Sequence, residues 1–310
     1  MSGIFAGLLA VSGAAQTGTF AVFSLGCVSA ARSTTRDKYT FSGCTVSSAT
    51  AATDGSYGGA AAGTCAAGIF ALGSTTTVTA GSTTRNKYTY SSDVVSVGAV
   101  SSVGGWQSSA AGNATFGIFA IGLRAGVGPV TIRNKYTYSS DTSAVGGTAS
   151  STSALGSAAG NATFGIFALG NACACFPTAR DKYTYSSCAV AAGGAATVAS
   201  NSGSATGNST TGIFALGYNA CCVRLTTRNK YTYSGCTVAA GTAATSASAQ
   251  GSAAGNSTTG IFALGCVGGG RSTTRNKYTY SGCVVSAGGA ASAASLRGTA
   301  ASNGTTGVNM

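Results

Sequence analysis

The chain has 310 residues, enough for one large repeat domain or two ordinary ones. It carries 17 basic and 5 acidic residues, for a formal net charge of +12, and contains no histidine. The composition therefore excludes Ser-His and Cys-His nucleophile pairs and a histidine general base. Because 44% of the residues are hydrophobic and regularly placed, it also excludes a disordered chain.

The apolar N-terminal segment, 1–11, has no basic region and is too short to span a bilayer. We interpret it as a partial first strand of a repeat array, with a poor signal peptide as the alternative. The array itself is defined by six copies of a basic, tyrosine-rich motif, of which 228–234 (RNKYTYS) is the clearest. The copies begin at 36, 85, 133, 180, 228 and 275, at intervals of 49, 48, 47, 48 and 47 residues. This period indicates a single repeat domain over 1–310.

Within each unit an apolar motif precedes the basic one, as at 212–217 (GIFALG). We expect a strand there with apolar groups on both faces, as in a sheet covered on both sides. A variable connection, 218–225, leads to a second predicted strand at 226–234, which is rich in β-forming residues. The Ala-, Gly- and Ser-rich segment 237–255 has room for one or two more short strands.

The last residues, 303–308, repeat the polar lead-in of the apolar strand and begin another copy. A chain that starts and ends inside a unit can complete one unit from its two termini. Units of about 48 residues with up to four strands therefore predict a six-bladed β-propeller closed by the N- and C-terminal segments. An open β-solenoid or prism of the same period is the alternative.

The repeated basic strand supplies most of the positive charge. Because this charge recurs once per unit, we interpret it as part of the scaffold. With almost no carboxylates available, we expect each arginine to donate to loop carbonyls and Asn side chains and to face tyrosine rings. We expect each lysine ammonium to reach water or carbonyl groups. A ring that binds phosphate or acidic sugars is the alternative. The residues are Arg36, Lys38, Arg85, Lys87, Arg133, Lys135, Arg180, Lys182, Arg228, Lys230, Arg275 and Lys277.

The carboxylates and cysteines also follow the repeat. Asp37 and Asp181 replace an asparagine of the basic motif, and Asp93 and Asp141 replace a cysteine that follows it elsewhere. A glycosidase would need two carboxylates close together, so we predict no enzyme. The 11 cysteines lack the CxxC spacing and histidines of a zinc site. We therefore expect no metal or cofactor, and small half-buried thiols, with disulfides between units as the alternative.

Function is expected in the connections that differ between units. The candidate partner contacts there are Thr76, Arg124, Asn171, Tyr218, Arg224 and Arg271. Asn-x-Ser/Thr sequences also recur at the repeat period, as at Asn113 and Asn208. We interpret these as turn-forming residues rather than as glycosylation sites.

The pairing of an Ile-Phe-Ala-Leu-Gly strand, a variable loop and a charged strand ending in tyrosine resembles kelch repeats. The amino-acid sequences of the two motifs are also similar to those of repeat proteins of tailed bacteriophages. This resemblance implies a virion or extracellular-surface protein. Our hypothesis is a non-enzymatic structural or adhesion protein of the tail or fibre type, with other virion or surface proteins and a host glycan as partners. We expect neither nucleic acid nor membrane as a partner, and the oligomeric state stays open. The alternatives are a soluble carbohydrate-binding lectin and a kelch-like protein-interaction scaffold.

Overall fold

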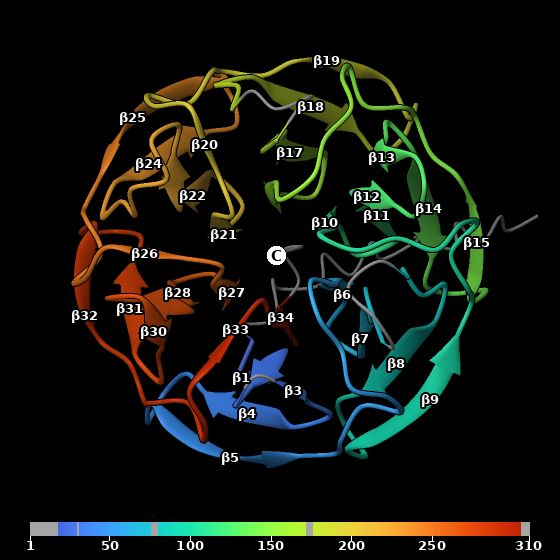
Figure 1. The fold of residues 1–310 in the computed structure, drawn as a ribbon, viewed down its shortest axis with the longest axis horizontal. Coiled ribbons are helices and arrows are strands. Elements are labelled where there is room, and N and C mark those ends of the chain that lie inside the picture. The colour runs from blue at the N-terminus through green and yellow to red at the C-terminus, as the bar shows by residue number, and fades with distance from the viewer. Residues whose placement is uncertain (1–17, 30, 76–79, 172–175, 305–310) are drawn as a thin grey trace, which may run out of the picture.

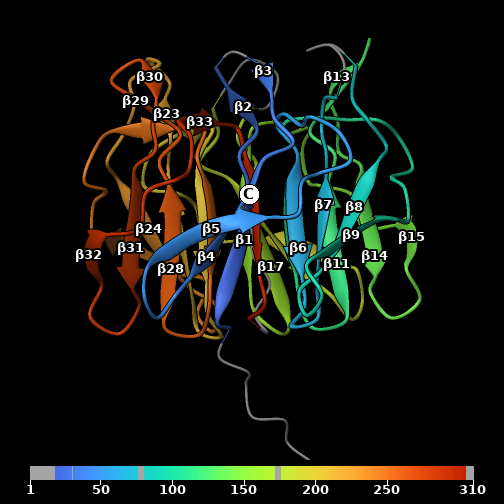
Figure 2. The same ribbon diagram turned by 90° about the horizontal axis from the view of Figure 1, so that it is seen from below.

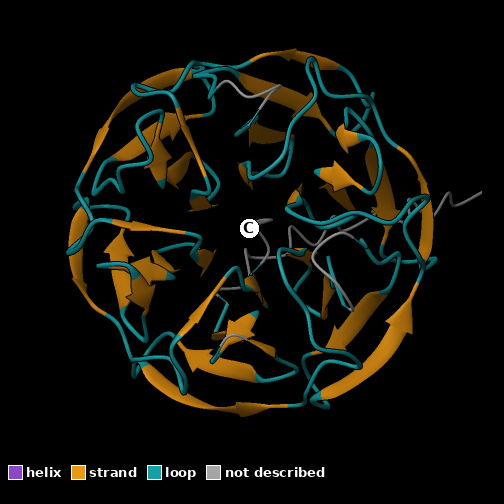
Figure 3. Cartoon of the chain, viewed as in Figure 1, coloured by secondary structure: helices purple, strands orange, loops and turns teal. Residues whose placement is uncertain are grey.

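The computed structural model describes residues 18–29, 31–75, 80–171 and 176–304. Within these residues the regular structure is β-strand, with no helix (Figure 3). This confirms the prediction of an all-β chain. In the same part of the chain, six four-stranded antiparallel sheets stand around a common centre (Figure 1). This arrangement is consistent with a propeller.

Each sheet uses the same strand order from the centre outwards. The innermost strands are β34 (Thr299–Ser302), β6 (Ala60–Gly63), β10 (Ser109–Gly112), β16 (Ser157–Gly160), β21 (Ser204–Gly207) and β27 (Ser252–Gly255). The second strands are β1 (Phe20–Ser24), β7 (Ala67–Ala71), β11 (Phe116–Ala120), β17 (Phe164–Ala168), β22 (Thr211–Ala215) and β28 (Thr259–Ala263). The third strands are β4 (Arg36–Thr40), β8 (Arg85–Thr89), β14 (Arg133–Thr137), β18 (Arg180–Thr184), β24 (Arg228–Thr232) and β31 (Arg275–Thr279). The outermost strands are β5 (Thr45–Ala49), β9 (Val94–Gly98), β15 (Thr142–Val145), β19 (Val190–Ala192), β25 (Thr237–Gly241) and β32 (Val284–Ala287). We number the sheets 1 to 6 in the order of these four sets.

Sheet 1 joins the two ends of the described chain. The C-terminal strand β34 pairs with β1, with Ala21 opposite Ser302 and Ser24 opposite Thr299. The innermost strands also contact one another in the cyclic order β34, β6, β10, β16, β21, β27 and back to β34. The predicted strand at 1–11 and residues 305–308 lie outside the described residues.

Small residues allow the sheets to approach each other closely. The innermost strands are built from alanine, glycine, serine and threonine and are buried throughout. In the second strand of sheet 5, Gly212 lies opposite Tyr231. A methyl group on Gly212 would lie 2.9 Å from the hydroxyl of Tyr233 and 3.1 Å from the ring of Phe214. A larger residue there would therefore displace the aromatic side chains of its own sheet.

Aromatic side chains fill the space between neighbouring sheets. Between sheets 4 and 5, Ile166 packs with Phe214, Tyr231 and Tyr233, all of which are buried. The Phe214 and Tyr231 rings meet edge to face with centroids 6.3 Å apart. Equivalent clusters lie between the other neighbouring sheets. The core is thus a set of similar layers between sheets.

The strands occupy the predicted segments with shifted ends. The apolar motif at 212–217 forms β22, which begins at Thr211 and ends at Ala215. The predicted strand at 226–234 is shorter, since β24 covers Arg228–Thr232. The segment 237–255 holds β25, the short strand β26 (Ser248–Ala249) and β27.

Short strands cover one end of the sheets, which we call the upper face (Figure 2). This face is formed by the connections between second and third strands and by the segments that lead into the innermost strands. Its short strands, besides β26, are β2 (Cys27–Val28), β3 (Ala31–Arg32), β12 (Leu123–Arg124), β13 (Gly128–Pro129), β20 (Ser200–Asn201), β23 (Tyr218–Asn219), β29 (Cys266–Val267), β30 (Gly270–Arg271) and β33 (Ser295–Leu296).

Candidate binding surface

The arginine of every repeated basic strand is buried between two sheets, with at most 2% of its surface exposed. Each one donates a hydrogen bond from Nη2 to the Asn or Asp at the second position of the third strand in the next sheet. In sheet 5, Arg228 donates to Asn276 of sheet 6 at 3.0 Å. We call these six links the arginine belt. They run from Arg36 to Asn86, Arg85 to Asn134, Arg133 to Asp181, Arg180 to Asn229, Arg228 to Asn276, and Arg275 to Asp37.

Backbone carbonyls and aromatic rings complete the environment of the buried guanidinium groups. Arg228, for example, donates from Nη1 to the carbonyl of Ala243 at 3.5 Å. The arginine Cζ lies 4.5–4.6 Å from the centroid of a phenylalanine ring in the neighbouring sheet, as Arg228 does from Phe262. In two links the acceptor is a carboxylate, with Arg133 2.6 Å from Asp181 and Arg275 2.7 Å from Asp37. Because these groups are buried and bound to one another, they are not available to a ligand.

The lysines of the same strands are half-buried and approach the turn after the third strand of the next sheet. Lys87 forms an ion pair with Asp141 at 3.6 Å. At the equivalent place, Lys135 lies 3.7 Å from the Sγ of Cys188 and 3.4 Å from the carbonyl of Tyr185. The lysines therefore lie along the sides of the sheets, away from the upper face. The nine cysteines that the structure describes are free thiols, and Cys173 and Cys175 lie outside the described residues.

The Asn-x-Ser/Thr sequences form the turns between first and second strands. The Oδ1 of Asn113 accepts hydrogen bonds from the backbone NH groups of Thr115 and Phe116, both at 2.8 Å. Its Nδ2 donates to the carbonyl of Ala162 in the next turn at 2.9 Å. These asparagines therefore hold their own turn and link it to the neighbouring one.

Burial of the tyrosines predicts loss of stability at alkaline pH. Burial raises the pKa of Tyr231 to about 12, and the pKa values of ten described tyrosines are raised in all. A raised pKa stabilises the fold below the ordinary tyrosine value near 10, and that stabilisation is lost as pH rises through the folded-state value. Burial lowers the pKa of Arg85 to about 10, and it also lowers the pKa values of the other five belt arginines. These arginine shifts have the opposite effect, because they raise the stability of the fold as the pH rises.

Because the tyrosines outnumber the arginines, we expect constant stability up to about pH 9 and cooperative unfolding between about pH 10 and 12. Circular dichroism and tyrosinate absorption, recorded on the same samples, should change together. Ionisation of the tyrosines near pH 10 with the circular dichroism signal intact would contradict this prediction.

The basic residues outside the repeated strands lie on the upper face. They are Arg32, Arg124, Arg224, Arg271 and Arg297, and the one carboxylate among the described residues of this face is Asp54. Arg271 donates to the Sγ of Cys27 at 3.4 Å, and Arg32 to the carbonyl and hydroxyl of Ser74. The upper face is therefore positively charged with little compensation from acidic groups.

The structure brings two of the predicted contact residues together. Arg224 stacks on Tyr218, with its Cζ 5.3 Å from the ring centroid. Arg124, in the β12–β13 hairpin, is exposed. Arg271 lies in β30, in the connection between β28 and β31, and Asn171 lies near the start of the connection that follows β17. Thr76 lies outside the described residues.

Six further residues of the upper face form a ring that the sequence did not indicate. They lie two residues before each innermost strand, and we call them the axial ring. Backbone hydrogen bonds join them in cyclic order, for example from Ser202 N to Leu155 O at 2.8 Å and from Arg297 N to Gln250 O at 2.7 Å. In one link the donor is the backbone NH of Ser108, which follows the ring residue Gln107, and the acceptor is the carbonyl of Gly58 at 3.2 Å. The ring residues are Gly58, Gln107, Leu155, Ser202, Gln250 and Arg297.

All six ring residues have positive φ angles of 54–63°, although five of them are not glycine. Such a conformation costs about 1 kcal/mol or more for a residue with a side chain. Another position with positive φ angles, of 69–79°, lies just after the second strand. Glycine occupies that position in all six units, as at Gly217. The axial ring therefore retains side chains where the backbone alone would favour glycine.

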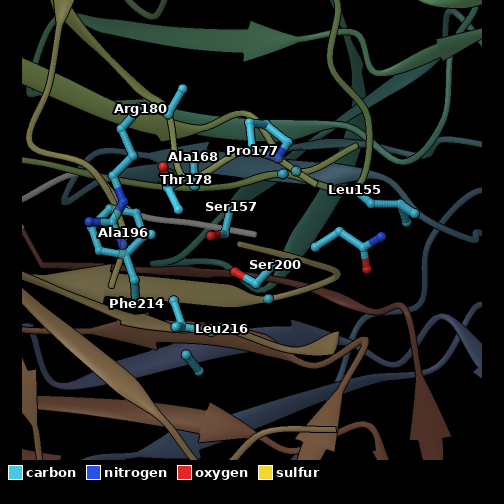
Figure 4. Close-up of a pocket in the computed structure, with 16 residues that line it drawn as sticks. Leu155, Ser157, Ala168, Pro177, Thr178, Arg180, Ala196, Ser200, Phe214 and Leu216 are labelled. Carbon is cyan, nitrogen blue, oxygen red and sulfur yellow. The ribbon is translucent and has the colours of Figure 1, made fainter. Parts of the chain in front are cut away.

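Four ring residues border a pocket of about 390 Å³ on the upper face, which we call the axial pocket. Its lining consists of Leu155, Phe176, Asn201, Ser202, Tyr218, Cys222, Arg224, Gln250 and Arg297. Below it, a crevice between sheets 4 and 5 is lined by Arg180, Ala196, Phe214 and their neighbours (Figure 4). This crevice has about 10 Å³ of free space, enough for a single water molecule at most. The axial pocket therefore has room for an organic ligand, whereas this crevice does not.

No known protein-family model matches the chain, and no curated protein is significantly similar to it. The part of the chain that the structure describes contains no helix long and apolar enough to cross a membrane. Among the same residues, no three His, Cys, Asp or Glu side chains gather as a metal site would require.

Proposed function

We propose that the chain forms a six-bladed β-propeller, closed by pairing of its N- and C-terminal segments. We also propose that it acts as a non-enzymatic recognition protein whose upper face contacts a surface glycan. The closed propeller is supported by two cyclic sets of hydrogen bonds. Both the arginine belt and the axial ring link each sheet to the next and the sixth to the first.

The observation that carries the recognition function is the separation of repeated and variable side chains. The repeated arginines, phenylalanines and tyrosines are buried between sheets, where they serve the fold. The variable side chains gather on the upper face, around the axial ring and in the connections beside it. Such a division, with a rigid scaffold presenting variable loops, is typical of binding proteins. A lectin with one sugar site per unit is less well supported, because the ring residues differ between units.

A location on a virion or at an extracellular surface is part of this proposal and rests on the resemblance of the repeated motifs. Other virion or surface proteins are proposed as partners on the same basis. The proposed absence of catalysis is supported by the carboxylates. Asp37 and Asp181 are buried against arginines, so neither is free to act as an acid or base toward a substrate.

Two exposed cysteines on opposite faces allow a direct test. Cys222 lies on the upper face, whereas Cys65 lies in the turn between β6 and β7 at the other end of its sheet. A bulky polymer would be attached through a maleimide to variants that retain one of these thiols, with the other, Cys221, Cys173 and Cys175 changed to serine. We expect the labelled protein to bind acidic or neutral glycans on an array, and the polymer on Cys222 to abolish binding.

The polymer on Cys65 is the matched control and should leave binding unchanged. Loss of binding from the Cys65 conjugate alone would place the contact surface on the opposite face. The absence of binding to any glycan, with the unlabelled protein folded, would refute a glycan partner.

A further inference from the structure

We infer that the axial pocket binds a single carboxylate-bearing sugar, such as a uronic or sialic acid within an acidic glycan. This inference rests on the proposed recognition function and specifies its ligand. The pocket volume of about 390 Å³ lies within the range of small-molecule sites, toward its lower end. That volume suits one sugar residue better than an extended chain.

The charge of the pocket favours an anionic ligand. Arg224 and Arg297 both line it, and among the described residues no carboxylate does. The upper-face carboxylate, Asp54, is exposed and lies outside this lining. Arg224 is half-buried, with its guanidinium over the Tyr218 ring. Arginine donors in a planar fork match the geometry of a carboxylate, so a ligand carboxylate would satisfy the charge of the two arginines.

Arg297 is held in place before any ligand arrives. Its Cζ lies 4.7 Å from the centroid of the Tyr57 ring, and its Nη1 donates to the hydroxyl of the same residue. With its amide oxygen turned toward Arg297, Gln250 accepts hydrogen bonds from Nη2 at 2.8 Å and Nε at 3.2 Å. These contacts leave the guanidinium further donors, because it has five in total. A preorganised cation reduces the entropy lost on binding.

The remaining lining favours a sugar over a simple anion. Phe176 and Tyr218 offer aromatic surface for the apolar face of a sugar ring. Asn201, Ser202 and Gln250 offer amide and hydroxyl groups for its hydroxyls. Inorganic phosphate would use the arginines and leave this apolar surface without a contact. The left-handed backbone of the ring residues, kept with side chains at an energetic cost, places Leu155, Gln250 and Arg297 at the rim.

Isothermal titration calorimetry at low ionic strength would test the inference with glucuronate and N-acetylneuraminate, against glucose and inorganic phosphate. We expect the carboxylate sugars to bind and both controls to bind at least about 10-fold more weakly. Arg224→Gln and Arg297→Gln should each weaken binding by about 10-fold or more, since each removes a charged hydrogen bond. Lys182→Gln removes the same charge from the side of sheet 4, away from the upper face, and should change the affinity by less than about 2-fold.

Thermal melts of each variant keep the result interpretable if Arg297→Gln disturbs the contacts with Tyr57. In that case Arg224→Gln, whose residue is not part of the ring, decides the question. Equal affinity for glucose, equally tight binding of phosphate, or the same loss of affinity in Lys182→Gln would overturn the inference. Binding of neutral glycans on the array without carboxylate preference would overturn it while leaving the proposed function intact. If neither the calorimetry nor the glycan array detects binding, both the inference and the proposed glycan-binding function are refuted.

Discussion

Replacement of Arg133 by methionine is expected to lower the free energy of unfolding by about 3–5 kcal/mol. Arg133 and Asp181 are each 1% exposed and lie 2.6 Å apart. Without the guanidinium, the carboxylate keeps its hydrogen bonds from Ser150 but loses its counter-charge. A buried charge without a partner is strongly destabilising. Urea unfolding followed by circular dichroism would measure the change.

Two other variants separate the charge from the loss of packing. Asp181→Asn recreates the Arg–Asn link that four other sheets contain, and it should cost less than about 1.5 kcal/mol. Arg228→Met leaves a neutral acceptor, Asn276, and should therefore cost less than Arg133→Met. If all three variants lose the same stability, the counter-charge is not the reason for it.

Deletion of residues 299–310 is expected to prevent the chain from folding to a stable monomer. The deletion removes β34, whose four residues are at most 4% exposed, and leaves the edge of β1 unpaired. It also removes the contacts of β34 with β6 and β27. An exposed strand edge promotes aggregation, and the deletion also uncovers the neighbouring innermost strands, whereas the whole stability of a domain is only about 5–15 kcal/mol.

Size-exclusion chromatography and thermal unfolding would measure this outcome. Deletion of 305–310 is the matched control, because it leaves β34 intact. A synthetic peptide covering 299–304 should partly restore the monomer when added to the shorter chain. A truncated chain that elutes as a monomer with the unfolding temperature of the full chain would show that pairing of the ends is dispensable.

The repeated features of the structure could be predicted from the sequence because they recur. The spacing of the basic motif predicts the number of units, and the tyrosine-rich strand is found close to its expected position, over Arg228–Thr232. The scarcity of carboxylates indicates asparagine as one kind of partner for its arginine, but the sequence does not indicate which asparagine. The link from Arg228 to Asn276 joins two units, and its register depends on how adjacent sheets pack. The apolar strand ends earlier than predicted, because Gly217 turns the chain with a φ angle of 78°.

The axial ring could not be predicted, because no single residue type occupies its six positions. Its residues have no shared chemistry, since Gly58, Leu155 and Arg297 occupy equivalent positions. What they share is a backbone conformation and a place two residues before a short strand of small residues. That placement is visible in the sequence once the innermost strands are known. Among the predicted contact residues, the structure joins Tyr218 and Arg224 in one pocket, which their sequence spacing alone does not reveal.

The axial ring determines how the proposed ligand preference could change. Its cyclic hydrogen bonds use backbone NH and carbonyl groups, so the side chain at one ring position contributes nothing to the links of the others. A substitution at one of the four positions that border the axial pocket alters its rim and leaves the backbone links intact. The proposed specificity could therefore be modified at these four positions, with Gln250 and Arg297 changed together because their side chains are hydrogen-bonded. These positions suit combinatorial libraries of engineered binders.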